Sequence, residues 1–340
     1  MSDIFVRETD SEYNFVCNRE NGKWALLKRD FSGDFEDVLD SAPIEGVLFS
    51  GTDTVLLNVG TGCNLDCLYC HLGKDKTGVQ MPLETGRKAL DRVMELPESD
   101  REVIFHGGEP LVYYPLIKEL VKYGKGLGIR RFGLQTNGTL LSDEMLDFFH
   151  ENNVGIGVSL DGLREHQDVT RRDAKGGGTY ESVRRNIHKI VDRSGGVSVI
   201  SVVSCYNVSD LEDITKGFSD MGVSSVRFSP VYPTSYLGIS PDINEFSGNL
   251  ISVFDDYLNR LMNGDRGIRI LNLQGLVRTL FREKKTFNCA KCGNGDRQPL
   301  VAVDIDGSIY PCDFFWGREE YKMGHIDEDM LMDAINSHKN

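Results

Sequence analysis

Short apolar runs recur through the middle of the 340-residue chain, separated by segments of helical periodicity. The runs are "TVLLNV" (54–59), "EVIFHG" (102–107), "RRFGLQT" (130–136), "VGIGVSL" (154–160), "VSVISVV" (197–203) and "SVRFSP" (225–230). Runs of this kind predict buried strands, and the periodic segments predict helices at 82–96, 116–127, 142–151, 179–191, 209–221 and 245–262. Because strand and helix alternate, we expect a parallel sheet with right-handed crossovers. Six units predict an α/β fold, a partial (β/α)6 TIM-like barrel open on one side.

Two of these helices begin at recognisable end signals. Ser142 precedes two acidic residues, which favours a helix N-terminus at that point. The pair Ser209 and Glu212 fits the spacing of a capping box.

The ends of the chain have a different pattern. Residues 1–50 predict a small β element, since "EYNFVC" and "KWALLKR" flank the turn signal "NRENG". The barrel core is expected at 51–240, a helical linker region at 241–285 and a C-terminal extension at 286–340. In that extension "LVAVDI" and "SIYPC" predict a β-hairpin at the Asp306-Gly307 turn signal.

Composition narrows the class of partner. Acidic residues outnumber basic ones by 52 to 38, giving a net charge of -14, and no run of five or more Lys or Arg is present. We therefore expect no nucleic-acid partner. The first residues lack the pattern of a signal peptide and no apolar run has the length of a membrane span, so a cytoplasmic protein without a membrane partner is expected.

Six of the eight cysteines fall in two groups. In the first group Cys63, Cys67 and Cys70 follow the first predicted strand, where a parallel sheet places its ligand site. Three thiolates at this spacing can hold an Fe-S cluster and leave the fourth iron of a 4Fe-4S cube open. Zinc is an alternative, although His71 is badly placed as a fourth ligand. Three unrelated core cysteines are the remaining alternative.

This C-x3-C-x2-C spacing, with an aromatic residue before the last Cys, resembles the signature of the radical S-adenosylmethionine (SAM) superfamily. The resemblance implies that the open iron chelates SAM and that an electron from the cluster cleaves it to a 5′-deoxyadenosyl radical. It also implies an external electron donor such as flavodoxin or ferredoxin.

Further motifs match this family. "HGGEP" resembles its GGEP motif, which implies that Gly107 and Gly108 let the backbone approach the methionyl group and that Glu109 accepts from the SAM ammonium. The resemblance places Tyr69 near the adenine, and Asn137, Ser159 and Asp161 near the ribose or carboxylate. The segment "QDVTRRDAKGGGTYESVRRNI" (167–187) resembles the family's HDxxR…GxGTF pattern, with Gln167 in place of the usual His. Arg171 then becomes the candidate for the SAM carboxylate, because a guanidinium can bind it bidentately; a solvated arginine is the alternative.

The second cysteine group comprises Cys289, Cys292 and Cys312. The spacing from Cys292 through Gly307 to Cys312 resembles SPASM and twitch domains, which carry auxiliary Fe-S clusters. The surrounding segment resembles anaerobic sulfatase-maturating enzymes, which oxidise a Cys or Ser of a target peptide to formylglycine. No cysteine follows Cys312, so we expect one auxiliary cluster of the 4Fe-4S type, whose fourth site Cys17, Cys205, another side chain or substrate could take. A zinc knuckle is the alternative.

In the sulfatase-maturating enzymes the Asp after the hairpin Cys is the proposed general base, and here that residue is Asp313. The alternative is a turn or cap residue. The sequence thus predicts a radical SAM enzyme, an oxidoreductase or peptide maturase, that modifies a peptide or protein side chain by oxidation, crosslinking or thioether formation. Two other hypotheses are radical chemistry on a small molecule, such as a nucleotide or sugar, and a non-catalytic zinc-binding module.

Overall fold

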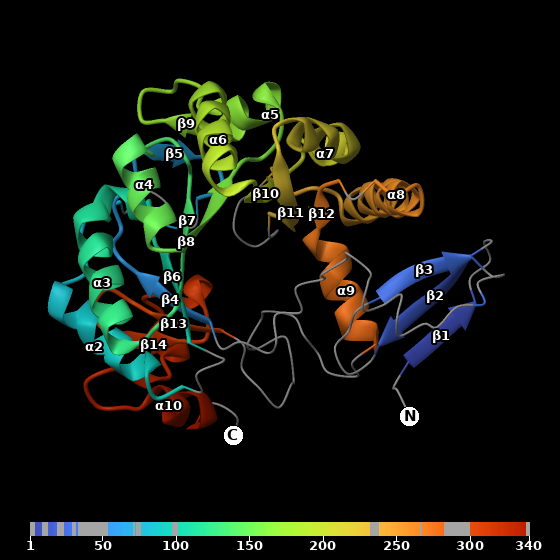
Figure 1. The fold of residues 1–340 in the computed structure, drawn as a ribbon. Coiled ribbons are helices and arrows are strands. Elements are labelled where there is room, and N and C mark those ends of the chain that lie inside the picture. The colour runs from blue at the N-terminus through green and yellow to red at the C-terminus, as the bar shows by residue number, and fades with distance from the viewer. Residues whose placement is uncertain are drawn as a thin grey trace.

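Ten strands form the main sheet of the protein, drawn in the computed structural model of Figure 1. The structure describes residues 4–8, 13–18, 24–28, 32, 54–70, 72, 76–96, 101–231, 238–265, 267–281 and 300–337. Six parallel strands make up the centre: β4 (Thr54–Asn58), β6 (Glu102–His106), β7 (Arg131–Thr136), β8 (Val154–Ser159), β10 (Val197–Val203) and β11 (Val223–Pro230). They pair in chain order, as a (β/α)6 partial barrel requires. The predicted strands and fold class are confirmed.

Helices follow these strands and cover one face of the sheet (Figure 1). They are α2 (Leu83–Val93), α3 (Tyr114–Leu127), α4 (Asp143–Glu151), α6 (Tyr180–Ser194), α7 (Leu211–Asp220) and α8 (Ile243–Met262). Their apolar stripes pack against alternate strand residues such as Leu57, Phe105 and Val199 in one continuous core. Since every second strand residue points into this core, the residues between them face the barrel interior.

One predicted helix start is confirmed and one is wrong. Ser142 caps α4, because its Oγ accepts from the Met145 N–H at 3.2 Å. The capping box at Ser209 and Glu212 does not form: α7 begins after Asp210, and the Ser209 hydroxyl donates to the Asp210 carboxylate at 3.1 Å instead. A 3-10 turn, η3 (Val208–Asp210), precedes the helix and moves its start by two residues.

The C-terminal hairpin is part of the barrel sheet. Strand β13 (Leu300–Val303) pairs in parallel with β4, then β14 (Ser308–Tyr310) pairs antiparallel with β13. Gly307 has φ +95°, which favours glycine at the predicted turn. The inner face of β4 and β13 packs against Phe315, Trp316 and Tyr321, so the chain after the hairpin folds over the barrel interior.

The other elements are short or peripheral. They are α5 (Arg164–Thr170), β5 (Leu65–Cys67), β9 (Arg171–Asp173), β12 (Arg269–Ile270), α9 (Leu271–Phe281), η2 (Pro110–Tyr113), η4 (Asp313–Phe315), η5 (Glu319–Tyr321), β15 (Gly324–His325) and α10 (Leu331–Ser337). At the N-terminus β1 (Ile4–Glu8), β2 (Tyr13–Asn18) and β3 (Trp24–Lys28) form a separate antiparallel sheet (Figure 1). Two of its strands agree with the predicted β element, and β1 was not predicted.

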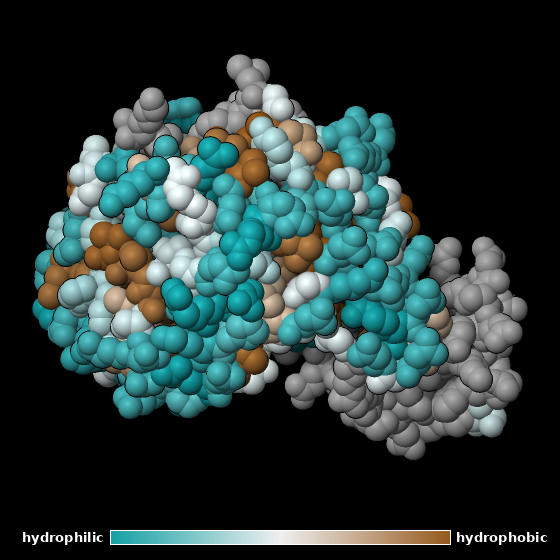
Figure 2. All heavy atoms as spheres, turned by 90° about the horizontal axis from the view of Figure 1, so that it is seen from above, coloured by the Kyte–Doolittle hydropathy of each residue, from teal (hydrophilic) through white to brown (hydrophobic). Residues whose placement is uncertain are grey.

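The surface is mostly hydrophilic on the face drawn in Figure 2, where small hydrophobic patches lie apart from one another. Among the described residues, none of the helices has the length and hydropathy to cross a membrane.

Candidate functional site

The loop with the first three cysteines lies at the carboxyl end of β4. Cys67 is the last residue of β5, which pairs antiparallel with β9 so that Cys67 lies opposite Arg171. The Leu68 N–H extends this ladder by donating to the Thr170 carbonyl at 2.9 Å. The segment around Arg171 therefore holds the cysteine loop through its backbone, a contact that sequence patterns did not predict because two three-residue strands carry no periodicity.

Gly107 and Gly108 bring the end of β6 against the residues that precede Cys63. The Gly108 N–H donates to the Gly60 carbonyl at 2.9 Å, and the Glu109 N–H donates to the Gly62 carbonyl at 2.8 Å. A Cβ on Gly108 would lie 2.4 Å from the Gly62 carbonyl oxygen, and one on Gly107 would lie 2.5 Å from that of Gly60. Close backbone contacts within the protein therefore require glycine at both positions. This requirement is separate from the approach to the methionyl group that the motif implies.

Glu109 is buried among donors at the ends of β6 and β7. Its carboxylate accepts from the Thr136 hydroxyl at 2.6 Å, the Asn137 N–H at 2.7 Å and the Leu111 N–H at 3.0 Å. Burial raises the pKa of Glu109 although these three hydrogen bonds oppose the shift. A carboxylate that is costly to ionise without a counter-ion is well suited to a bound cation, such as the ammonium group that the GGEP resemblance assigns to it.

Asn137 connects β7 to the cysteine loop. Its amide donates to Asn64 Oδ1 at 2.9 Å, and its Oδ1 accepts from the Thr139 hydroxyl at 2.7 Å. The Asn64 amide in turn donates to the Thr139 hydroxyl at 2.8 Å. Asn137 Nδ2 also lies 4.0 Å from Cys63 Sγ. Asn137 therefore lies directly beside the first cysteine, and its position near the SAM ribose or carboxylate stays a prediction.

Asp161 is the most constrained of the candidate residues, with none of its surface exposed. Its carboxylate accepts from Tyr69 OH at 2.5 Å, from Thr170 Oγ1 at 2.6 Å, from Arg171 Nε at 2.9 Å and from the Val202 N–H at 3.2 Å. Four donors occupy a carboxylate fully. We infer that Asp161 orients Tyr69 and Arg171, and its position near the SAM ribose or carboxylate stays a prediction.

Tyr69 and Arg171 lie against each other on this carboxylate. The Arg171 guanidinium lies over the Tyr69 ring, 5.4 Å from its centre. Burial raises the pKa of Tyr69, so its hydroxyl keeps the proton that it donates to Asp161. Only Nε of Arg171 is used by Asp161, and its terminal nitrogens make no hydrogen bond to the described residues. These terminal nitrogens are the groups that could bind a carboxylate.

Gln167 supports Asp161 from the backbone side. Its Oε1 accepts from the Asp161 N–H at 2.9 Å, and its Nε2 donates to the Thr179 hydroxyl at 3.0 Å. Gln167 stands where the family usually has His. Its buried amide gives a hydrogen-bond partner to both the Asp161 N–H and the Thr179 hydroxyl. Ser159, at the end of β8, accepts from Gln135 Nε2 at 3.0 Å and is mostly buried.

The three thiols of the loop are close enough to affect one another's charge. Burial raises the pKa of the Cys67 thiol to about 11, and the neighbouring Cys70 and Cys63 add to the effect. Among the described residues no three His, Cys, Asp or Glu side chains converge as ligands of a single metal ion. A 4Fe-4S cluster needs a wider arrangement, because each thiolate binds a different iron. Cysteines spread along a partly buried loop beside a cationic Arg171 fit such a cluster.

Asp313 lies within the barrel site, next to the GGEP segment. Its Oδ2 is 3.9 Å from His106 Nδ1 at the carboxyl end of β6. The rings of His106 and Trp316 are 5.8 Å apart, and His106 Nδ1 and Trp316 Nε1 are buried without a hydrogen-bond partner in the described part of the chain. His106 was not predicted as a site residue, although it is the first letter of the quoted "HGGEP".

The second cysteine group is described only in part. Cys312 immediately precedes η4 and is half-buried, whereas Cys289 and Cys292 lie outside the described residues. The auxiliary cluster stays a prediction. Cys205 is exposed, with its thiol directed to the Gly238 carbonyl at 3.8 Å.

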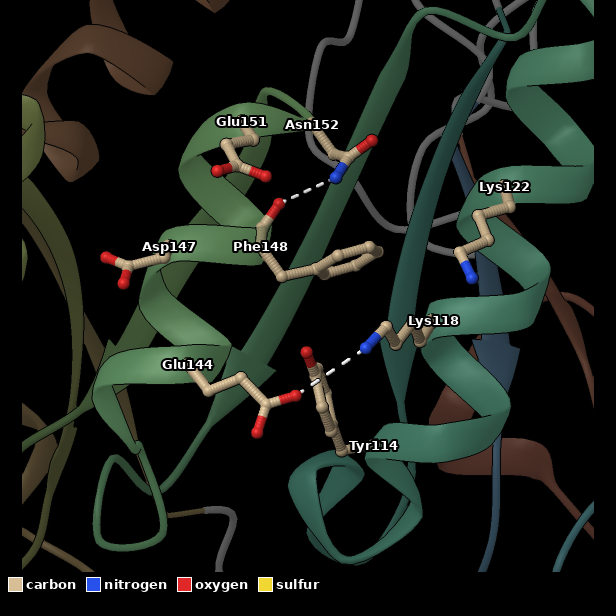
Figure 3. A pocket seen from close by; sticks show the side chains of 8 residues that line it. All are labelled: Tyr114, Lys118, Lys122, Glu144, Asp147, Phe148, Glu151 and Asn152. Atoms are coloured by element: carbon tan, nitrogen blue, oxygen red, sulfur yellow. Dashed lines mark hydrogen bonds and ion pairs between the residues drawn. The ribbon is translucent and has the colours of Figure 1, made fainter.

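A surface pocket of about 460 Å³ lies elsewhere, between α3 and α4 on the outside of the barrel (Figure 3). Lys118 reaches across it to Glu144 at 3.5 Å. It contains none of the predicted site residues, and we assign the chemistry to the strand ends instead.

Comparisons with known proteins agree with this geometry. The model of the radical SAM superfamily matches residues 57–218. An uncharacterized protein of Methanothermobacter thermautotrophicus is 30% identical over 68% of this chain and 88% of its own. The cysteine-type anaerobic sulfatase-maturating enzyme of Clostridium novyi is 29% identical over 82% of this chain and 77% of its own. The solved structure of native anSMEcpe with bound AdoMet has a TM-score of 0.72 at 24% identity, covering 84% of this chain and 81% of that one.

The chain contains a radical SAM domain, in the residues 57–218 that the family model matches. It is an enzyme related to the anaerobic sulfatase-maturating enzymes, and its family implies a 4Fe-4S cluster and SAM as cofactors.

Proposed function

We propose that the protein oxidises a side chain of a peptide or protein substrate by radical chemistry. The bound cluster and SAM supply the radical that removes a hydrogen atom from the substrate carbon. Cys63, Cys67 and Cys70 would hold the cluster, and Arg171 and Glu109 would bind the carboxylate and ammonium of SAM. Relatives whose names state sulfatase maturation support a protein substrate.

The position of Asp313 is the observation that best supports oxidation of the substrate side chain. Its carboxylate lies 3.9 Å from His106 Nδ1 at the carboxyl end of β6, immediately before Gly107 in the sequence, which supports a role for Asp313 near the residues expected to bind the cofactor. A base at this place accepts the thiol or hydroxyl proton of the substrate. The substrate would lose one hydrogen atom to the radical and one proton to Asp313; an auxiliary cluster, if held by Cys289, Cys292 and Cys312, would supply the acceptor for the remaining electron. The substrate then carries a new C=S or C=O bond.

The test is anaerobic incubation of reconstituted protein with SAM, a reductant and a cysteine-containing peptide such as Cp18Cys, followed by mass spectrometry. We expect the peptide to lose two hydrogen atoms, or to appear as the hydrolysed aldehyde. Formation of 5′-deoxyadenosine with an unchanged peptide would count against peptide oxidation. The main alternative, radical chemistry on a nucleotide or sugar, would then be tested next. The radical SAM domain at residues 57–218 argues against the non-catalytic zinc module.

A further inference from the structure

Arg227 lies on the inner wall of the barrel, in the same row as a predicted SAM residue. Its neighbours on β11, Val226 and Phe228, point into the core, so the Arg227 side chain points to the opposite face. The strand ladder pairs Arg227 with Ile200 of β10, and Ile200 with Ser159 of β8. Two strand spacings separate Arg227 from Ser159, about 10 Å. The arginine therefore faces the interior at the level of the cofactor residues.

Four residues along β8 from Ser159, toward the amino ends of the strands, the inner wall carries small side chains. In closed TIM barrels the interior is filled by bulky branched residues. Here inward positions of β7 and β8 are Gly133 and Gly155, and a Cβ on either would meet no atom closer than 3.5 Å. Packing against the protein thus does not require glycine at these two positions. Their lack of side chains leaves room deeper in the barrel, about 13 Å from Ser159 along β8.

Arg227 has no counter-ion among the described residues. The residue is exposed, and its side chain forms no ion pair or hydrogen bond with them. The surrounding protein nevertheless lowers the pKa of Arg227 through burial, as expected for a cation enclosed by walls rather than one on a convex surface. In a chain with a net charge of -14, a cation kept apart from acidic side chains is suited to an anion from outside the protein.

We propose that Arg227 binds a carboxylate of the substrate, an acidic side chain or chain end of the modified peptide. This deepens the proposed function and rests on it for the choice of a peptide. The guanidinium offers a bidentate, charge-assisted pair to a carboxylate. With the anchor about 10 Å from Ser159, the reacting residue lies a few residues along the peptide from the acidic one.

Arginine footprinting tests this without turnover. Reconstituted protein with its cofactors is treated anaerobically with phenylglyoxal, and adducts are located by peptide mass mapping. The probes are acetyl-Asp-Gly-Gly-Cys-Gly-amide, its Asn counterpart, inorganic phosphate, and SAM alone. Arg184, on the outer helix α6 and half-exposed, is the internal control. We expect the Asp peptide to slow Arg227 modification about tenfold and the Asn peptide to leave it unchanged, because the charge-assisted pair is lost.

Each other outcome overturns the proposal in a different way. Equal protection by inorganic phosphate would identify a phosphate site and argue for a small-molecule substrate. Protection by SAM alone would make Arg227 a cofactor residue. Modification at the same rate with every probe would show that Arg227 binds no anion. Because footprinting reports binding, it stays informative even where the peptide oxidation assay fails, and so separates the two proposals.

Discussion

Replacing Asp161 by Asn tests whether this residue holds the site together or contacts SAM. Asparagine keeps the shape of the side chain but places an amide N–H₂ where the carboxylate accepts from Arg171 or Tyr69. Arg171, whose side chain is 10% exposed, would then lose the carboxylate that balances its charge. Removing one partner of a buried pair costs about 3–5 kcal/mol.

A loss of stability of that size should be measurable in the segments around Asp161. The β5–β9 ladder depends on Arg171 and Tyr69, so its amides should exchange with deuterium about 10²- to 10⁴-fold faster in the Asp161→Asn protein, even without SAM. Thr170→Val is the matched control, since it removes one neutral donor to the same carboxylate at a cost of about 1 kcal/mol. The affinity for SAM should fall in Asp161→Asn and much less in the control.

The reasoning would be refuted by one combination of results. If SAM affinity falls in Asp161→Asn while the SAM-free protein exchanges its β5–β9 amides at the parent rate, the residue contacts SAM directly. The inference from its four hydrogen bonds would then be wrong.

Two further predictions use other parts of the site. Asp313→Asn should leave SAM cleavage intact and lower the yield of oxidised peptide, because an amide cannot accept the substrate proton; normal yield, measured by mass spectrometry, would return Asp313 to a structural role. Gly108→Ala should destabilise the cysteine loop by about 1–3 kcal/mol and reduce the iron retained after reconstitution, since its Cβ would meet the Gly62 carbonyl oxygen at 2.4 Å. Gly155→Ala is its control, with no contact closer than 3.7 Å, and iron retention equal in the two variants would contradict the steric argument.

The central sheet could be predicted from the sequence because each strand is an apolar run and each helix has an apolar stripe. The short strands that position the site could not be predicted from the sequence. Strands β5 and β9 are three residues each, and their pairing depends on contacts between segments about 100 residues apart rather than on a local pattern. The capping box at Ser209 failed for a related reason, since a 3-10 turn competed with the helix start.

The sequence identified which residues belong to the candidate site, but not how those residues contact one another. Motif spacing identified Tyr69, Asp161 and Arg171, and the structure brings all three together. It could not show that Asp161 is fully enclosed, because burial depends on the whole fold. The surroundings of Arg227 and His106 could not be predicted either. Those of Arg227 depend on the pairing of strands, and those of His106 depend on the chain that folds back over β4 and β13.

The formation of 5′-deoxyadenosine from SAM is the most direct test of the account. Anaerobically reconstituted protein should be brown, with about eight iron atoms per chain for two 4Fe-4S clusters. After reduction it should convert SAM to 5′-deoxyadenosine and methionine, while Cys63→Ala should form none. A colourless protein that forms no 5′-deoxyadenosine, or equal formation by Cys63→Ala, would contradict the assignment of Cys63, Cys67 and Cys70 to a SAM-cleaving cluster.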